Sequence, residues 1–250
     1  MRIAAIYDIH GNLPALEAVL EEIHRDGVDQ VVVGGDVVPG PMPRETIAAL
    51  LHLDLPVRFI RGNGEREVLA RLAGTETETG AVPPPFREVI RWVAEQLDPE
   101  HERLLASWPE TLRLDVPGSG AVLFCHATPR SDSEVFTRRT PEDRLLSIFE
   151  GLDVELVVCG HTHMQDDRTI GSVRVVNAGS VGMPFGEPGA YWLLLGPGIE
   201  LRHTRYDLAK AAARIRGTSY PQAREFAAHD ILRPRSEDEA LELFARAESR

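Results

Sequence analysis

Short apolar segments alternate with helical patterns from the first residues of the chain onward, and few folds are compatible with that alternation. Residues 2–7 (RIAAIY) form a continuous apolar run, which is typical of a strand buried on both faces. A helix is expected to begin after Asn12, which is a good N-cap residue. The pattern repeats as a strand at 31–33, a helix at 44–53 and a strand at 57–60. This β-α-β-α-β order predicts a parallel sheet with right-handed crossovers.

The second half of the chain changes to short strands without long helices between them. Two helices are expected first, at 86–97 and 99–106. Strands are then expected at residues 111–116, 121–125, 155–159, 173–177, 190–195 and 199–206. Glycine-containing turns (PGSG and GPG) predict hairpins, and therefore an antiparallel or mixed sheet. Together the two halves predict an α/β fold in which two mixed sheets pack face to face with helices outside.

The composition excludes several kinds of chemistry. The chain of 250 residues carries a formal charge of -12, which does not suit a protein that binds duplex DNA through its phosphates. The single lysine, Lys210, is followed by alanines, so the chain has no P-loop and only one candidate for a Schiff base. Cys125 and Cys159 both lie in apolar runs and are expected to be buried thiols without a disulfide.

Nothing in the sequence predicts contact with a membrane. No window approaches 18 apolar residues, and the apolar stretch at the N-terminus is too short for a signal peptide. We therefore expect a soluble cytoplasmic protein. The segment 74–85 (GTETETGAVPPP) is a loop by composition; a surface insertion is expected, and a lid over a site is the alternative.

Polar side chains follow five of the expected strands, each at the carboxyl end of its strand. Since the carboxyl ends of strands line the ligand crevice in α/β sheets, these side chains are expected to converge. They are Asp8, His10, Asp36, Asn63, His126, His161 and His163. Carboxylate, amide and imidazole donors without a thiolate favour manganese, iron, cobalt, nickel or zinc over calcium. The number of donors exceeds the needs of one open metal site and matches two ions if one carboxylate bridges them.

Each part of this set has an ordinary explanation when it is taken alone. An Asp-x-His turn is common, and His126 alone is typical of a core histidine. The pair His161 and His163 is more informative, because alternate residues point the same way and suit adjacent ligands. The remaining histidines have no such partners and are expected to be structural: His24, His52, His101, His203 and His229.

The ordered series Asp-x-His, Gly-Asp, Gly-Asn, His and Gly-His-Thr-His resembles the calcineurin-like metallophosphoesterases, and in particular their compact bacterial phosphodiesterase branch. The resemblance runs over residues 1–206, through blocks such as YDIHGNLPALEAVL, GGDVVPGPMPRETI and VNAGSVGMP. It implies a four-layer αββα sandwich, two bound divalent ions and hydrolysis of phosphate esters. Residues 207–250 are then expected to form a helical C-terminal extension packed on the same metallophosphoesterase domain.

The resemblance also implies how the ligands divide between the ions. One ion would be held by Asp8, His10, Asp36 and His163. The other would be held by Asp36, Asn63, His126 and His161, so that Asp36 bridges the two ions. Asp36, Asn63 and His126 are expected to take part in catalysis as well. Manganese is the expected metal, with iron, nickel, cobalt or zinc as alternatives.

The chain departs from the family pattern at one position. The family commonly has a histidine directly after the asparagine, taken to protonate the leaving group or to steady the phosphate, whereas this chain has Gly64. Replacing Gly64 with histidine is therefore expected to raise the turnover of substrates with poor leaving groups. Glu65 is the nearest titratable side chain. It is expected to satisfy exposed N–H groups in the first turn of the next helix, and a role as the acid is the alternative.

Two further sets of residues are expected near the site. The segment 177–184 (NAGSVGMP) is expected to close it, with Asn177 or Ser180 within reach of a metal ligand. Arginines in the motif loops are candidates to bind a phosphate, although each is otherwise an ordinary surface charge: Arg61, Arg66, Arg130, Arg138 and Arg139.

These observations predict a dinuclear, metal-dependent phosphoesterase that hydrolyses small phosphodiesters by attack of a hydroxide bridging the ions. Two dications against two aspartates would make the crevice positive although the chain is acidic. The alternatives are a phosphomonoesterase or nucleotide pyrophosphohydrolase with the same site, and a non-catalytic scaffold with this fold. The expected partner is a small phosphate ester, not duplex nucleic acid or a membrane. The sequence does not predict an oligomeric state.

Overall fold

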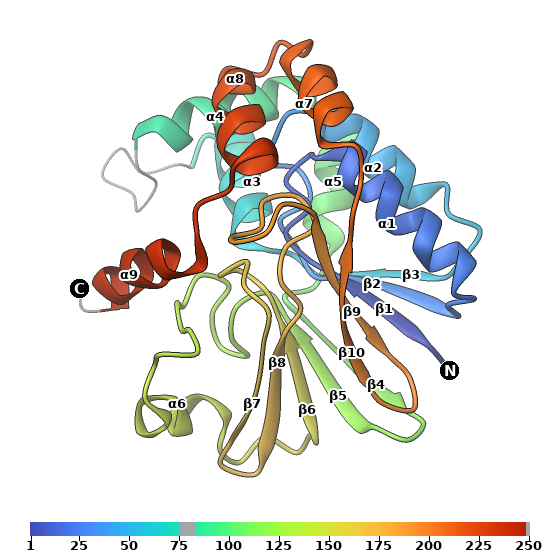
Figure 1. Ribbon diagram of the computed structural model, residues 1–250, viewed down its shortest axis with the longest axis vertical. Helices are drawn as coiled ribbons and strands as arrows, with labels where there is room; N and C mark the ends of the chain where they lie inside the picture. The colour runs from blue at the N-terminus through green and yellow to red at the C-terminus, as the bar shows by residue number, and fades with distance from the viewer. Residues whose placement is uncertain (76–83, 249–250) are drawn as a thin grey trace.

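The computed structural model describes residues 1–75 and 84–248. Two five-stranded sheets are stacked with helices outside them (Figure 1). In chain order the elements are β1 (Ile3–Ile6), α1 (Leu13–Arg25), β2 (Gln30–Val33), α2 (Pro43–Leu51), β3 (Val57–Phe59), α3 (Asn63–Ala73), α4 (Pro84–Gln96), α5 (Pro99–Ser107), β4 (Thr111–Val116), β5 (Gly120–Cys125), α6 (Glu142–Phe149), β6 (Leu156–Cys159), β7 (Asp166–Ile170), β8 (Val173–Asn177), β9 (Ala190–Leu195), β10 (Ile199–Thr204), α7 (Leu208–Arg216), α8 (Ala223–Phe226), the π-helix η1 (Ala227–Leu232) and α9 (Glu237–Glu248). The loop predicted at 74–85 falls mainly on 76–83, outside the described residues, so neither form of that prediction is tested.

The first sheet has the strand order β10-β9-β1-β2-β3. β1, β2 and β3 are parallel, as the β-α-β-α-β pattern predicts. β9 pairs antiparallel with β1, and β10 returns along β9 as the hairpin expected from the glycine turn. The first sheet is therefore mixed and joins strands from distant parts of the sequence.

The second sheet has the strand order β4-β5-β6-β8-β7. Its three central strands are parallel, while β4 and β7 run antiparallel at the two edges. The six strands expected in the second half of the sequence are present within two residues of their predicted bounds. β7 (DDRTI) is not among the strands expected from the sequence, because three charged residues hide its alternation; as an edge strand it leaves alternate side chains exposed.

The core between the sheets is built from alternate residues of the strands. Ile3, Ala5 and Tyr7 pack among residues of the second sheet, whereas Ala4 and Ile6 pack among the helices. All five side chains are fully buried. A strand covered on both faces explains the continuous apolar run at residues 2–7, and each buried isoleucine stabilises the fold by about 1.5–3 kcal/mol.

Helices cover both outer faces, so the chain forms the predicted αββα sandwich. Residues of α1, α2, α4 and α7 belong to the apolar cluster on the outer face of the first sheet. α6 covers the second sheet, where Leu145 and Phe149 pack against Val157. Cys125 and Cys159 lie in that same cluster as buried free thiols, as predicted.

The C-terminal segment contacts both halves of the molecule. Tyr220 and Phe226 pack in the cluster on the first sheet, and Tyr220 meets Trp92 of α4 edge to face. α9 instead packs on Met164 and Phe185, which follow strands of the second sheet. Among the described residues, no helix combines the length and the apolar content that crossing a bilayer requires.

Candidate metal centre

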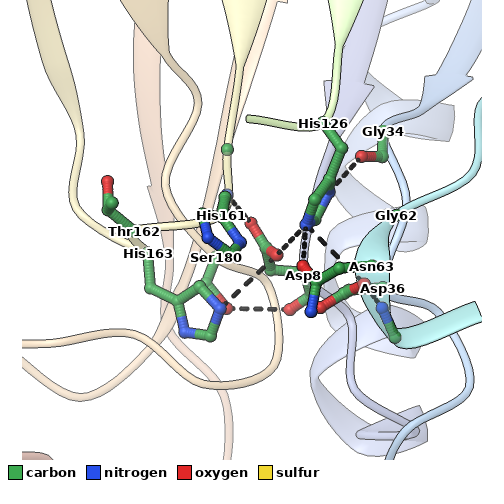
Figure 2. Close-up of polar contacts among 12 residues, drawn as sticks. Asp8, Gly34, Asp36, Gly62, Asn63, His126, His161, Thr162, His163 and Ser180 are labelled. Carbon is green, nitrogen blue, oxygen red and sulfur yellow. Dashed lines mark hydrogen bonds and ion pairs between the residues drawn. The ribbon is translucent and has the colours of Figure 1, made fainter. Parts of the chain in front are cut away.

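All seven residues selected from the sequence lie at one edge of the stacked sheets. Asp8 follows β1, Asp36 follows β2, and Asn63 begins α3 shortly after β3. His126 follows β5 and His161 follows β6, and these are parallel strands of the second sheet. Figure 2 shows His161 and His163 on the left, Asp36 and Asn63 on the right below His126, and Asp8 between the two sides. The predicted convergence of strand ends is therefore present.

Asp8, His10 and His163 form the first tight group of donors. Nε2 of His10 lies 3.1 Å from Nε2 of His163. Oδ1 of Asp8 lies 3.4 Å from Nε2 of His163 and 3.9 Å from Nε2 of His10. One carboxylate oxygen and two imidazole nitrogens, supplied by two different loops, thus point at one another.

Asp8, Asp36 and His126 form the second tight group. Nε2 of His126 lies 3.6 Å from Oδ1 of Asp36 and 3.8 Å from Oδ1 of Asp8. Oδ1 of Asn63 lies 3.1 Å from the same nitrogen. The ring of His161 stands beside that of His126, with 5.2 Å between centroids, but outside the two tight groups.

Both carboxylates lie between the two groups. Oδ1 of Asp36 faces His126, and its Oδ2 lies 3.8 Å from Nε2 of His10. The resemblance gives the bridging role to Asp36, and the structure places Asp36 where it can reach both sides. Asp8 has the same property, since its Oδ1 belongs to both groups.

Backbone carbonyls fix the orientation of three of the histidine rings. A carbonyl oxygen only accepts hydrogen bonds, so the ring nitrogen facing it carries the hydrogen, and in the neutral ring the other nitrogen keeps its lone pair. The pairs are His10 Nδ1 with Pro39 O at 3.1 Å, His126 Nδ1 with Gly34 O at 2.9 Å, and His163 Nδ1 with Met183 O at 2.8 Å. Each Nε2 is therefore directed at the centre, and those of His10 and His163 face each other across 3.1 Å, where a proton on one ring or a cation between them would separate the two lone pairs.

The backbone at the site is held in an uncommon conformation. Left-handed backbone costs about 1–2 kcal/mol per residue outside glycine, although aspartate and histidine tolerate it better than most. Within the described ranges, every non-glycine residue with positive φ is one of the predicted ligands, with φ between 49° and 68°: Asp8, His10, Asp36, His161 and His163. Such strain persists where the surrounding structure enforces it, which is characteristic of functional sites.

The four histidines of the site form two pairs whose pKa values are shifted in opposite directions. Burial and the neighbouring His163 lower the pKa of His10 to about 4. Burial and the neighbouring His126 lower the pKa of His161 to about 3. Burial also opposes protonation of His126 and His163, but the adjacent aspartates outweigh it and raise the pKa of both. Each half of the site thus favours one positive charge.

Asp8 provides the clearest test of whether a metal ion fits. Its Oδ1 is buried and has no hydrogen-bond partner among the described residues, whereas its Oδ2 accepts from the backbone N–H of His161 at 2.8 Å. Burial disfavours the charge on Asp8, yet the neighbouring histidines, His163 foremost, together outweigh burial and lower the pKa of the carboxyl. A buried charged oxygen without a hydrogen bond is costly, and a histidine at 3.4 Å compensates it only in part. A divalent cation held by the surrounding nitrogen and oxygen donors satisfies it.

Position 64 has no room for the side chain that the family commonly carries there. A Cβ at Gly64 would lie 2.3 Å from Cγ of Pro39 and 2.8 Å from Oδ1 of Asp36. The backbone N–H of Gly64 donates to that same oxygen at 2.7 Å. The expectation for Gly64→His is therefore corrected: a histidine would displace Pro39 or Asp36 instead of reaching a leaving group.

Glu65 has the structural role expected for it. Its side chain is fully buried. Its two oxygens accept four backbone N–H groups at 2.6–3.2 Å, from Asp36, Val37, Val38 and Gly62. The carboxylate caps α3 and also holds the loop after β2 that carries Asp36. With its oxygens committed to the backbone, Glu65 does not serve as the acid.

The candidate arginines are engaged by carboxylates. Each forms an ion pair at 2.5–3.0 Å: Arg61 with Glu110, Arg66 with Asp132, Arg130 with Glu134, Arg138 with Glu237, and Arg139 with Asp238. The structure therefore favours the ordinary interpretation, in which these arginines are surface charges paired within the protein.

The segment 177–184 closes the site through the backbone, as expected. Oγ of Ser180 donates to the carbonyl of Asp8 at 2.8 Å and accepts from the N–H of Met183 at 2.8 Å. Nδ2 of Asn177 donates to the carbonyl of Gly160 at 2.7 Å. These contacts hold the residues that carry and flank the ligands, and not the ligand side chains.

Several residues at the site were not selected from the sequence. The backbone carbonyls that orient the histidine rings cannot be picked out from the sequence, because every residue has one. Phe185 stacks on the ring of His163, with centroids 5.8 Å apart and planes at 25°. Asp230 of η1 interacts electrostatically with His163, and burial raises its pKa to about 7. The one sequence signal for Phe185 is its position directly after the VGMP block.

Two comparisons of the sequence identify relatives. The profile of the calcineurin-like phosphoesterase superfamily domain matches residues 1–195. Among curated proteins, the uncharacterized protein MJ0912 of Methanocaldococcus jannaschii is 28% identical over 245 residues, which cover 88% of this chain and 94% of that protein. The family match thus spans both sheets up to the end of β9.

Solved structures share the fold over nearly the whole chain. The hypothetical protein PH1004 from Pyrococcus horikoshii has a TM-score of 0.79 at 20% identity, covering 94% of this chain and 99% of that one. A metallophosphoesterase from Sphaerobacter thermophilus has a TM-score of 0.70 at 25% identity, covering 91% and 98%. The chain belongs to the calcineurin-like phosphoesterase superfamily and is a hydrolase that acts on phosphate esters.

Proposed function

We propose that the protein is a dinuclear metal-dependent phosphodiesterase of the compact bacterial branch and that it acts on small phosphodiesters. One observation carries the proposal: two groups of donors, Asp8 with His10 and His163, and Asp8 with Asp36 and His126, meet at distances of 3.1–3.9 Å. Carboxylate and imidazole donors without sulfur suit manganese, and also iron, nickel, cobalt or zinc.

The proposed ligand sets are those that the resemblance implies, and they overlap the two groups without being identical to them. Asp8, His10, Asp36 and His163 would hold one ion, and Asp36, Asn63, His126 and His161 would hold the other. When bound, the ions supply Lewis acidity towards the phosphoryl oxygens and a nucleophile drawn from water near neutral pH. Asp8 and Asp36 return only two negative charges against two dications, so the crevice attracts an anionic phosphate although the chain is acidic.

The chain's own residues keep the donors in place and leave the departing group without a proton donor at position 64. The carbonyls of Gly34, Pro39 and Met183 hold three rings with Nε2 directed inward. Gly64 contributes only its N–H, which is bonded to Asp36. The site therefore suits substrates whose leaving groups depart readily as anions, such as phenolates.

The pairing of the arginines supports a diester over a monoester or a polyphosphate. A diester carries one negative charge, and a monoester carries close to two at neutral pH. The five arginines of the motif loops are each held by a carboxylate, so they offer little additional attraction for a second charge. The metal ions alone are enough to bind the single charge of a diester.

The test compares hydrolysis of bis(p-nitrophenyl) phosphate with that of p-nitrophenyl phosphate by the full chain loaded with Mn²⁺. We expect faster turnover of the bis ester, which Asp36→Ala and His126→Ala abolish. His52→Ala is the matched control, because His52 is exposed and follows α2 outside the site, and it is expected to retain full activity.

Two results would contradict the proposal. Equal or faster turnover of the mono ester would favour a phosphomonoesterase or a nucleotide pyrophosphohydrolase with the same site. Hydrolysis of neither ester at any pH, with metal bound, would favour a non-catalytic scaffold.

The remaining parts of the proposal concern the metal, the partner and the compartment. We propose manganese as the metal, a small phosphate ester as the partner and the cytoplasm as the location, without binding to duplex nucleic acid or a membrane. We also propose residues 1–206 as the metallophosphoesterase domain and 207–250 as an extension packed on it. A screen of metals against ester substrates tests the first two parts directly.

A further inference from the structure

The last helix of the chain lies beside the metal centre, away from the rest of the C-terminal segment. Figure 1 shows α9, in red, set apart from α7 and α8 and beside the loops above β7 and β8. Ala240 and Leu241 are buried in a small apolar cluster with Met164, which directly follows His163. Phe185 and Phe244 pack against that cluster. α9 therefore contacts both Met164, which is next to His163 in the sequence, and Phe185, which stacks on the ring of His163.

Polar contacts anchor the start of α9 to the same loops. Ser236 and Glu239 form a reciprocal capping box, with Ser236 N–H donating to Glu239 at 2.9 Å and Glu239 N–H donating to Ser236 at 3.3 Å. Arg138 pairs with Glu237 at 2.5 Å. The N–H of Gly186 donates to the carbonyl of Arg235 at 2.8 Å, directly after Phe185. The helix is thus fixed in position and orientation where it meets Phe185.

A chain of aromatic contacts connects α9 to His163. Phe244 meets Phe185 edge to face, with 6.0 Å between centroids and 77° between planes. Phe185 stacks on His163, with 5.8 Å between centroids and 25° between planes. Met183 holds the Nδ1 edge of the same imidazole at 2.8 Å. One short segment therefore fixes both the edge and the face of the His163 ring, and α9 supports that segment from behind.

His163 needs such support. Its φ of 60° is in the left-handed region, and its Nε2 faces another nitrogen at 3.1 Å. Strained backbone of this kind persists only where the surrounding structure enforces it. Groups behind a metal ligand that orient it commonly change metal affinity by about 10–100-fold when they are removed.

We propose that α9 is a positioning element of the metal centre: Phe244 holds Phe185 against His163, and this contact sets the affinity of the Asp8, His10 and His163 group for its ion. The inference rests on the proposed function, because it requires that this group binds a metal. The second group serves as an internal reference, since its His126 follows β5 and its Asn63 lies after β3, away from Met164 and Phe185.

The experiment is a calorimetric titration of the metal-free full chain with Mn²⁺. Phe244→Ala is expected to weaken one of two binding events about tenfold and to leave the other unchanged. Leu243→Ala is the matched control: its side chain is 47% exposed on the same helix, and both affinities should equal those of the wild type. Phe244→Tyr retains the ring and should restore the weakened site.

A second variant and a second measurement guard against a general loss of folding. Phe185→Leu keeps an apolar side chain in the cluster but removes the stacked ring, so it should weaken the same single site while far-UV circular dichroism stays unchanged. In the metal-free chain, the NMR signal of the His163 ring should shift in Phe244→Ala and stay in place in Leu243→Ala.

The possible failures are distinguishable. Two binding events of wild-type affinity in both Phe244→Ala and Phe185→Leu would overturn the role of α9 and leave the proposed function intact. Equal weakening of both events in Phe244→Ala, with no rescue by tyrosine, would also overturn it. Absence of metal binding by the wild-type chain would overturn the inference together with the proposed function.

Discussion

The residues of the metal centre carry several costs to stability at once. Five of them have left-handed backbone, and two carboxylates lie side by side with histidines whose pKa values are shifted by burial and by each other. Oδ1 of Asp8 is buried, and no residue in the described part of the chain donates a hydrogen bond to it. Features of this kind lower stability and are retained where function requires them. Substitutions at these positions should therefore separate stability from activity.

Asp36→Asn should have opposite effects on the two properties. Burial, and then the nearby Asp8, raise the pKa of Asp36, so removing its charge should raise the free energy of unfolding of the metal-free chain by about 1 kcal/mol at pH 8. Hydrolysis should fall at least about 100-fold, because the substitution weakens the ligand proposed to be shared by two ions. Urea unfolding with a chelator present and steady-state kinetics measure the two effects. A metal-free variant less stable than the wild type would contradict this account.

Gly64→Ala should damage the site through a single added methyl group. The Cβ would meet Pro39 at 2.3 Å and Asp36 at 2.8 Å, so we expect a loss of about 1–3 kcal/mol in stability and a large loss of hydrolysis. Gly198→Ala is the control, because nothing lies within 4 Å of a Cβ there. Thermal melts and kinetics of the two variants make the comparison, and equal behaviour would show that position 64 does tolerate a side chain.

Asp230→Asn should change how stability depends on pH. Burial raises the pKa of Asp230 to about 7, against a smaller opposing effect of His163 and Arg235, and Tyr220 also faces it. A raised folded-state pKa gives stability that is full below about pH 4 and is lost as the pH rises through about 7. The variant should therefore gain about 1–3 kcal/mol over the wild type between pH 4 and pH 8. Urea unfolding of metal-free protein at both pH values tests this, and a pH-independent difference would count against it.

At the scale of elements, the strands that position the ligands follow directly from the sequence, because a buried strand leaves a continuous or alternating apolar pattern. β1, β5 and β6 are each such a run with a ligand at its end. β7 was missed because an edge strand needs little apolar content. The sequence shows that Gly64 stands where the family commonly has a histidine. It does not show that Pro39 leaves no room for a side chain there, because that depends on how two loops meet in space.

Glu65 joins two elements that carry ligands, so Glu65→Gln should weaken both. The carboxylate accepts N–H groups from the loop after β2 and from the start of α3. An amide leaves part of these donors unsatisfied, and we expect a loss of about 2–3 kcal/mol in the free energy of unfolding. Glu67→Gln, two residues along the same helix and at a carboxylate that pairs with Arg66 near the surface, should cost less than about 1 kcal/mol. Similar losses of unfolding free energy in both variants would contradict the role of Glu65 in joining the loop after β2 to α3.

At the scale of the whole molecule, the site exists only where the two sheets meet. Asp8, Asp36 and Asn63 come from the edge of the first sheet, and His126, His161 and His163 come from the edge of the second (Figure 2). The sequence predicts this meeting, since the carboxyl ends of parallel strands lie together. It does not predict the contact of α9 with Phe185. An amphipathic pattern shows which face of a helix is buried, but not which part of the protein that face packs against.

The most direct test of the account is a titration of the metal-free chain with Mn²⁺ in which bound metal and hydrolysis of bis(p-nitrophenyl) phosphate are measured at each point. The account predicts two ions bound per chain, hydrolysis that appears as the second ion binds, and a melting temperature that rises with bound metal and falls again on chelation. A single bound ion at full activity, or hydrolysis that does not depend on metal, would contradict it.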